Sequence, residues 1–322
     1  MLQDLVVPAT ILPATLSLEQ AAGAAGDFAR ASKADSTLRS YRTDAADFTA
    51  WCHGHQLDPL PASVDTLAAY LGHLANSGMK ASSITRRCAG LRYMHRAAGY
   101  EPPTNSEAIK AVLAGIRRSL GIAPTRKAPA TVEAIEAMLA VTPADSLRGL
   151  RDRALLLLGF AGALRRSELV ALDVDDIESD VDGVRVIIRR SKTDQEGAGD
   201  FVPIPNGTRL KPVAAILTWI EAAKISEGPL FRPITKGGTL RPRRLTDCSV
   251  AEIVKAKAEA AGFDARVFSG HSLRAGFVTS ALAAGADILR VMDQTRHREV
   301  RTLKAYDRRA KAFKGHAGEA FL

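Results

Sequence analysis

Residues 270–274 have the sequence Gly-His-Ser-Leu-Arg and lie in the last fifth of a 322-residue chain. His297 follows Arg274 by 23 residues, and Tyr306 follows His297 by nine. Imidazoles and a guanidinium suit a phosphate group, and a phenol suits nucleophilic attack. The order of these side chains makes them a candidate phosphate site.

Two upstream segments carry matching chemistry. Arg165-Arg-Ser-Glu168 places a guanidinium and a carboxylate one helical turn apart, and Lys192 lies in a polar segment between two strand-like runs. Taken singly, each has an ordinary explanation, such as a solvated helix arginine or a surface lysine in a loop. Together with the C-terminal group, they predict a site that cuts and rejoins a nucleic-acid backbone through a covalent tyrosine.

The composition allows two domains and a polyanionic partner. The formal charge is +9, and it divides into +5 over residues 27–126 and +6 over 127–322. Both prospective domains are therefore basic, as expected of a protein that holds DNA from two sides. The three cysteines are widely spaced and odd in number, so they form neither a disulfide framework nor a CxxC metal site. This cysteine usage is typical of a protein in a reducing cytoplasm.

The N-terminal segment and the apolar runs predict no membrane partner. No apolar run approaches the roughly 18–20 residues of a membrane span. Residues 1–26 contain neither Lys nor Arg, so the basic segment of a secretory signal is missing. This stretch repeats Pro-Ala-Thr at residues 8–10 and 13–15, and we predict that residues 1–26 form an extended or disordered lead-in.

Residues 27–120 show helical spacing and nothing typical of a strand. Apolar side chains recur every three or four residues in four stretches, which predicts a domain of four helices. The third stretch and its entry are basic, and could either contact DNA phosphates or form an ordinary solvated helix face. The candidate DNA-binding residues are Lys80, Arg86, Arg87, Arg92 and Arg96.

Residues 121–130 contain two prolines and lose the apolar periodicity, which predicts a linker. Beyond it, residues 131–322 predict a mainly helical domain with a small antiparallel sheet. The β-branched run 184–190 would pair with residues 201–204 across the loop that contains Lys192. Helices are expected from about residue 131 and at about 150–160, 165–172, 211–224, 248–262, 272–284, 287–295 and 299–312.

These segments together resemble the tyrosine recombinases of the phage-integrase and Xer type. Gly162–Leu169 resembles the first-arginine box of that family, Ser191–Asp194 its hairpin lysine, and Gly270–Arg274 its His-x-x-Arg box. Thr295-Arg296-His297 stands where members commonly have Leu-Gly-His, so two positions depart from the pattern. The resemblance covers nearly the whole chain.

The resemblance implies a mainly α fold, in which a four-helix SAM-like core-binding domain precedes a catalytic domain with a small antiparallel β-sheet. It implies cleavage and exchange of strands of double-stranded DNA through a 3′-phosphotyrosine, in the bacterial cytoplasm, as a homo-tetramer on paired sites. No metal or nucleotide cofactor is implied. The catalytic residues would be Arg165, Lys192, His271, Arg274, His297 and Tyr306, with Glu168 in support.

The residue chemistry is consistent with those roles. Arg165 and Arg274 can each grip phosphate oxygens bidentately and stay charged at physiological pH. Tyrosine has an unperturbed pKa near 10, so Tyr306 needs a base, for which His271 is the candidate. Lys192 would protonate the departing oxygen. Arg274→Ala is expected to abolish cleavage with little change in thermal stability.

Two other functions stay open. A type IB topoisomerase shares the tyrosine chemistry, and relaxation of plasmid DNA without recombinants would identify it. A non-catalytic DNA-binding protein derived from such an enzyme would fail a cleavage assay. Among recombinases, the Thr-Arg-His turn and the N-terminal lead-in favour the integrase of a mobile element. The target sequence, the need for accessory proteins and the docking of the C-terminal tail in cis or in trans also stay open.

Overall fold

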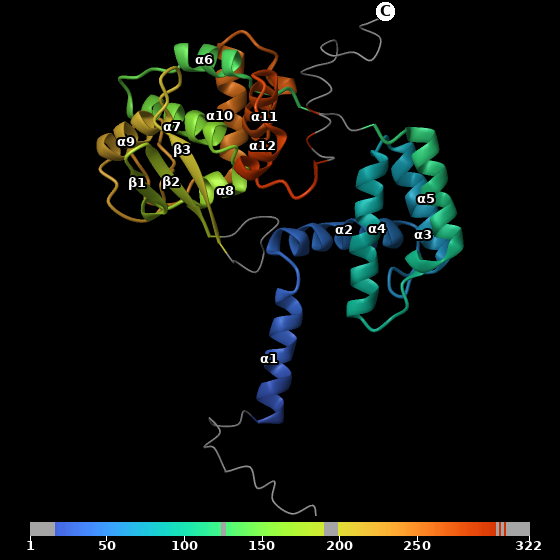
Figure 1. The fold of residues 1–322 in the computed structure, drawn as a ribbon. Helices are drawn as coiled ribbons and strands as arrows, with labels where there is room; N and C mark the ends of the chain where they lie inside the picture. Colours follow the sequence, from blue (N-terminus) through green and yellow to red (C-terminus); the bar gives the residue numbers. More distant parts are fainter. Residues whose placement is uncertain (1–16, 124–126, 190–198, 301–302, 304–305, 307–322) are drawn as a thin grey trace, which may run out of the picture. The chain divides into compact units, whose positions relative to one another are not determined.

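The chain divides into two compact units, Met1–Pro124 and Thr125–Leu322, called the N-terminal and C-terminal units below. The computed structural model describes residues 17–123, 127–189 and 199–300, together with residues 303 and 306. Within these residues the N-terminal unit consists of helices, whereas in the C-terminal unit helices pack around a small sheet (Figure 1). The predicted mainly α fold with a small antiparallel sheet is therefore confirmed.

Four helices form the core of the N-terminal unit, as the apolar spacing predicts. Phe48, Leu71 and Leu91 are fully buried at its centre. Ser63 and Ser106 each cap the helix that follows, because each hydroxyl accepts a hydrogen bond from a backbone N–H three residues on, at 3.0 and 3.3 Å. The helices are α2 (Asp35–Gly54), α3 (Val64–Asn76), α4 (Ala81–Ala97) and α5 (Glu107–Leu120), with a 3₁₀ turn at Pro103–Asn105.

A further helix precedes this core. Helix α1 (Leu18–Ala31) covers residues that we expected to be part of an extended lead-in, so that prediction is wrong from residue 18 onwards. Its sequence is rich in alanine, which has the highest helix propensity, and it lacks the prolines found nearer the terminus. Leu18 and Phe28 are 87% and 77% exposed, so this helix does not depend on burying them.

The C-terminal unit contains a three-stranded antiparallel sheet in the order β1-β2-β3. Strand β2 (Gly183–Ile188) pairs with β3 (Asp200–Pro205), as predicted, and Val186 lies opposite Val202. Strand β1 (Ile177–Asp180) was not predicted, since Ile-Glu-Ser-Asp has no alternation of apolar residues and its middle positions are exposed. Antiparallel pairing of all four of its residues with β2 holds this strand in the sheet.

Helix α7 (Leu147–Ala161) lies at the centre of the C-terminal unit and is buried over most of its length. It packs against α9 (Pro212–Ala223) and α11 (Ser272–Ala283). The other helices are α6 (Val132–Ala140), α8 (Arg166–Ala171), α10 (Asp247–Ala260) and α12 (Ile288–Thr295). These agree with the predicted helices.

The helix expected at 299–312 lies mostly outside the described residues. Leu303 and Tyr306 are described, and both are helical. Across the part of the chain that the structure describes, no helix combines the length and the apolar character needed to cross a membrane.

Candidate active site

Arg165 is fixed at the start of α8 by Glu168. The Glu168 carboxylate accepts a hydrogen bond from the Arg165 backbone N–H at 2.9 Å and one from its Nη1 at 2.5 Å. The Glu168 side chain is 2% exposed, whereas that of Arg165 is 19% exposed. A buried carboxylate thus orients a guanidinium that still reaches solvent.

Arg274 lies in the first turn of α11 and is almost completely buried. Its Nη1 donates to the Ala163 carbonyl at 2.8 Å, and its Nη2 donates to the Thr295 carbonyl. Helix α11 can approach α7 closely because Gly159 leaves room for Leu273, which would lie 2.7 Å from any Cβ at that position. The guanidinium therefore joins α11 to the segment before α8 and to the C-terminal end of α12.

Arg165 and Arg274 are close enough to influence each other electrostatically. Burial, and secondarily the positive charge of Arg165, lower the pKa of Arg274 to about 9. Arg274 is still protonated at neutral pH, so the two guanidiniums hold like charges near each other. The negative charge of Glu168 has the opposite effect and raises the pKa of Arg274. An anion bound by both guanidiniums would relieve this repulsion.

His297 has a partner at each ring nitrogen. Its Nδ1 lies 2.6 Å from Thr295 Oγ1, and its Nε2 lies 3.3 Å from Arg274 Nη2. Because the Thr295 hydroxyl donates to the Val291 carbonyl at 2.6 Å, it accepts from Nδ1–H, which leaves Nε2 as the acceptor. Burial, followed by the charge of Arg274, lowers the pKa of His297 to about 4, so the ring is neutral at neutral pH.

His271 and Tyr306 form the second part of the site. The Tyr306 hydroxyl lies 3.4 Å from Nε2 of His271, which occupies the position before α11. The tyrosine ring packs on a small apolar cluster that includes Val278 and Val291. The negative charge that Tyr306 carries when ionised raises the pKa of Arg274, so the phenol lies near that guanidinium.

Arg296 adds a third guanidinium that the sequence analysis did not assign to the site. Its Nη2 donates to Glu168 Oε2 at 2.6 Å, and its side chain is 8% exposed. The φ angle of Arg296 is 55°. Among the described residues of the site, Ala163 is the other non-glycine residue with a positive φ. The left-handed region costs a residue with a Cβ about 1–2 kcal/mol. Its Nε and Nη1 are buried without an acceptor among the described residues.

The structure thus brings together five of the six predicted catalytic residues and Glu168. Lys192 lies outside the described residues, so its position stays a prediction. The Thr295 hydroxyl and the Arg296 guanidinium were missed, although their departure from Leu-Gly was a visible signal. Within the described ranges, no group of three or more His, Cys, Asp or Glu is arranged to hold a metal ion.

Two of the candidate DNA-binding arginines on α4 have carboxylate partners within the N-terminal unit. Arg86 Nη2 lies 2.8 Å from Asp44 Oδ1, and its Nη1 bonds to Oδ2 of the same carboxylate. Arg87 bonds to Asp47 and lies 2.6 Å from the Tyr70 hydroxyl. The Arg86 side chain is nevertheless 48% exposed, whereas that of Arg87 is 14% exposed.

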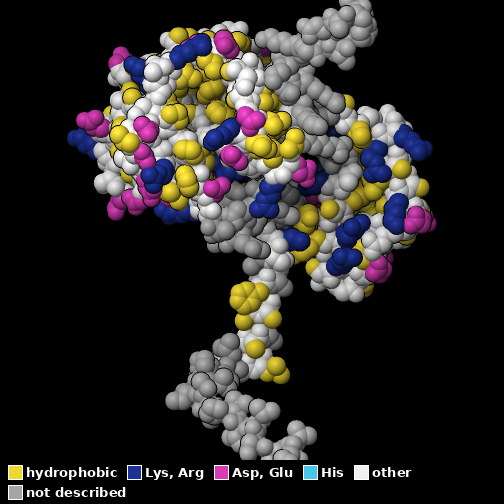
Figure 2. Space-filling view, viewed as in Figure 1, with side chains coloured by type: hydrophobic (Ala, Val, Ile, Leu, Met, Phe, Trp, Pro, Cys, Tyr) yellow, Lys and Arg dark blue, Asp and Glu magenta, His cyan; other side chains and the backbone are white. Residues whose placement is uncertain are grey.

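The other three candidates are more accessible. Arg92 Nε donates to Thr104 Oγ1 at 3.1 Å, and the side chains of Arg92, Arg96 and Lys80 are exposed. On the face of the N-terminal unit seen in Figure 2, Lys and Arg side chains are interspersed with apolar and acidic ones. DNA contact by these residues stays a prediction.

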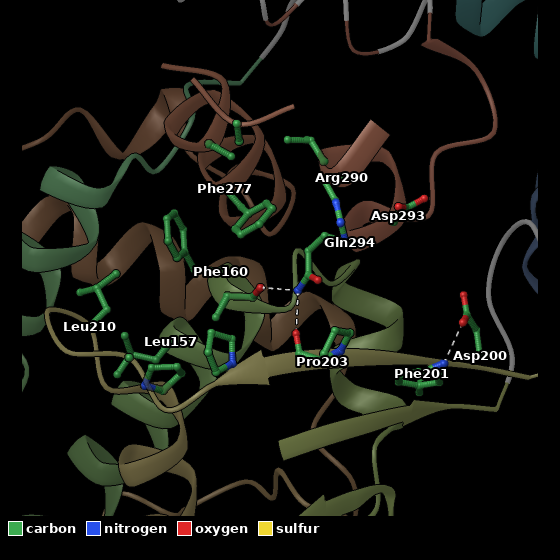
Figure 3. Close-up of a pocket in the computed structure, with 17 residues that line it drawn as sticks. Leu157, Phe160, Asp200, Phe201, Pro203, Leu210, Phe277, Arg290, Asp293 and Gln294 are labelled. Atoms are coloured by element: carbon green, nitrogen blue, oxygen red, sulfur yellow. Dashed lines mark hydrogen bonds between the residues drawn. The ribbon is translucent and has the colours of Figure 1, made fainter. Parts of the chain in front are cut away.

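A separate apolar cavity of about 750 Å³ lies beside α12. Phe160 of α7 and Phe277 of α11 line it together with Pro203 of β3 (Figure 3). At its edge the Gln294 side chain donates to the carbonyls of Ala161 and Pro203 at 2.9 and 3.1 Å. These bonds fasten the end of α12, immediately before Thr295 and His297, to α7 and β3.

Known proteins match this chain over nearly its full length. The phage integrase family matches residues 130–312, and the phage integrase N-terminal SAM-like domain matches residues 29–101. The integrase/recombinase xerD homolog of Selenomonas ruminantium is 40% identical over 291 residues, which cover 89% of this chain and 85% of that protein. The tyrosine recombinase XerD of Bradyrhizobium diazoefficiens is 31% identical, with 84% and 85% covered.

Solved structures share the fold at low sequence identity. A lambda integrase dimer bound to a core site has a TM-score of 0.58 at 15% identity, covering 91% of this chain and 77% of that one. The XerH recombinase in a post-cleavage complex with its difH substrate has a TM-score of 0.56 at 17% identity, covering 78% and 70%. These likenesses support the fold described above.

Proposed function

The chain belongs to the phage integrase family and is a site-specific tyrosine recombinase, and we propose that Tyr306 is its nucleophile. The observation that carries this proposal is the position of the Tyr306 hydroxyl, 3.4 Å from His271 Nε2 and near the guanidinium of Arg274. A phenol beside an imidazole and a cluster of cations can attack a phosphodiester.

The proposed reaction begins when Tyr306 attacks the scissile phosphorus. His271 takes the phenolic proton, a bond forms between the tyrosine oxygen and phosphorus, and the bond from phosphorus to the 5′-oxygen breaks. Lys192 supplies the proton that turns the departing oxygen into a hydroxyl. The DNA is left joined to the enzyme through a 3′-phosphotyrosine, and attack by another strand's 5′-hydroxyl restores the phosphodiester and frees Tyr306.

Arg165 and Arg274 would stabilise the charge that builds on the non-bridging oxygens. The two guanidiniums share one nearby carboxylate, Glu168, so the group has a positive charge to offer a phosphate. His297 would add a hydrogen bond. Its Nε2 becomes a donor when the Thr295 hydroxyl reverses direction and donates to Nδ1.

A nicked suicide substrate tests the nucleophile. Its target DNA comes from mapping covalent 3′-phosphotyrosyl ends across the DNA of the host element. We expect the wild-type protein to accumulate a covalent adduct on this substrate, and Tyr306→Phe to bind the DNA without forming one. Tyr100→Phe is the matched control, because Tyr100 is exposed on the N-terminal unit and should leave the adduct yield unchanged. An undiminished adduct with Tyr306→Phe would refute the assignment.

The partner is double-stranded DNA, and we propose phosphate contacts by Lys80, Arg86, Arg92 and Arg96, with Arg87 held back by its bond to Asp47. Each Arg→Ala change at an exposed position should reduce the slope of log affinity against log salt by about one. We further propose a homo-tetramer on paired sites, acting in the bacterial cytoplasm as the integrase of a mobile element.

A further inference from the structure

Arg296 occupies a position that is unfavourable for arginine in two respects. Its backbone is in the left-handed region, where glycine is favoured. Its guanidinium is buried, yet Nε and Nη1 have no acceptor in the part of the chain that the structure describes. Strained and under-satisfied residues persist where the surroundings fix them, and such places cluster at functional sites.

The bond from Arg296 to Glu168 is what offsets these costs. Glu168 is itself buried and is shared by two guanidiniums, since Arg296 bonds to Oε2 at 2.6 Å and Arg165 to Oε1 at 2.5 Å. The carboxylate therefore bridges the turn that carries His297 and the helix that follows Arg165. Among the described residues, a glycine at residue 296 would leave Glu168 with its bonds to Arg165 alone.

Each residue from 294 to 296 forms a hydrogen bond with a distant part of the C-terminal unit. Gln294 bonds to the carbonyls at the end of α7 and in β3, as Figure 3 shows. The Thr295 carbonyl accepts from Arg274, and its hydroxyl holds His297. Arg296 completes this run by reaching Glu168. Of the bonds made by residues 294–296, the bond from Arg296 to Glu168 is the one that connects to Arg165.

We propose that Arg296 is a positioning residue for strand cleavage, acting through Glu168 on Arg165. This inference rests on the proposed function, because it assumes that Arg165 contacts the scissile phosphate. Arg296 fixes the Glu168 carboxylate from one side, so that the other side holds the Arg165 guanidinium in one orientation. It does this without touching the phosphate, which distinguishes its role from those of Arg165 and Arg274.

Arg296→Gly tests this directly, because glycine suits the backbone and only the side chain is lost. We expect the rate of adduct formation at saturating DNA to fall roughly 10- to 100-fold, the size of effect that a misplaced catalytic group produces. The DNA concentration for half-maximal rate should change less than about twofold, because substrate binding is not altered. Arg296→Lys, which keeps the charge, should recover part of the rate.

Lys224→Gly is the matched backbone control. Lys224 ends α9 with φ 50° and ψ 46°, close to the 55° and 42° of Arg296, and its side chain is exposed. Relief of the same backbone strain should raise its unfolding midpoint by about 2 °C. Arg296→Gly should gain less or lose stability, because it also loses the ion pair. Lys224→Gly should cleave at the wild-type rate.

A double-mutant cycle tests the route through Glu168. If Arg296 acts through this carboxylate, Arg296→Gly should slow Glu168→Gln by no more than about twofold further, since coupled residues are not additive. A fully additive loss would overturn the proposal, and so would a wild-type cleavage rate for Arg296→Gly. Absence of a Tyr306 adduct in the unmutated protein would overturn the proposed function and this inference together, so the two failures are distinguishable.

Discussion

The two units each contain a cluster of arginines and acidic residues, but the charges balance in only one. In the N-terminal unit, Arg86 and Arg87 pair with Asp44 and Asp47, one carboxylate for each guanidinium. In the C-terminal unit, three guanidiniums gather around a single carboxylate, Glu168. In the first arrangement the charges cancel within the cluster, whereas the second has positive charge left for an anion.

Burial separates the clusters further. The Arg86 side chain is half-exposed, so its guanidinium stays in contact with water although its partner Asp44 is buried. Arg274 and Arg296 are almost completely buried, and the burial of Arg274 lowers its pKa. Repulsion between desolvated cations is a cost in the free protein that a bound phosphate removes. An excess of buried positive charge is therefore a better indicator of a phosphate site than the number of arginines.

The largest effect is expected from Arg274→Lys, which keeps a positive charge but loses the planar pair of donors. Adduct formation should fall by about 10²–10³-fold, as when a preorganised donor to the transition state is removed. Stability should fall as well, because the Ala163 and Thr295 carbonyls lose their donor. The sequence alone led us to expect little change in stability from loss of Arg274. Adduct formation within threefold of wild type would contradict the role of Arg274.

Asp44→Asn disturbs the balanced cluster instead. Asp44 is 1% exposed and accepts both Arg86 bonds, so the loss of its charge should destabilise the N-terminal unit by about 1–3 kcal/mol. The rate of adduct formation at saturating DNA should stay within about threefold of wild type. Chemical denaturation and the suicide substrate measure the two quantities. A large drop in the cleavage rate would show that the N-terminal cluster takes part in the chemistry.

Thr295→Val tests the support of His297 in the unbalanced cluster. Valine keeps the shape but removes the hydroxyl that pairs with Nδ1, whether it accepts from Nδ1–H or donates to Nδ1, so the ring loses the partner that sets its tautomer. We expect adduct formation to slow about tenfold, comparable to the loss of one supporting hydrogen bond of roughly 1.4 kcal/mol. Thr295→Ser should restore the rate. Equal rates for the valine and serine variants would show that the hydroxyl is not needed.

The last expected effect is a pH dependence of the stability of the free protein. The pKa of His297 is lowered to about 4 from an ordinary 6.5, so the unfolded chain binds the proton more readily than the folded one. Stability should therefore fall as pH drops from 6.5 towards 4, and the penalty should be complete below pH 4. His297→Gln should flatten this part of the profile relative to wild type. Identical profiles would mean that His297 is accessible and protonates freely.

The sequence predicted the helices and the paired strands well, because their apolar residues follow the periods of helix and strand. It failed at one strand and one helix. Strand β1 has no apolar alternation and is held by pairing with β2. Helix α1 has alanine-rich helical spacing, but it does not bury Leu18 or Phe28, so it is not part of the packed core that the pattern was used to find.

The order of the motifs also predicted which side chains would meet at the site. It could not predict the neutral state of His297, because the lowered pKa depends on burial and on the approach of Arg274 through the fold. Nor could it predict the bond from Arg296 to Glu168, which joins residues 128 positions apart. Such contacts depend on where the tertiary fold places α8 and the end of α12, not on local sequence.

The most direct measurement is the chemical identity of the link between protein and DNA. Wild-type protein would be trapped on the suicide substrate, digested with trypsin and a nuclease, and the modified peptide sequenced by mass spectrometry. We expect a nucleotide attached through its 3′-phosphate to Tyr306, in the peptide spanning residues 305–308. A nucleotide on another residue, or one attached through a 5′-phosphate, would contradict the proposed site.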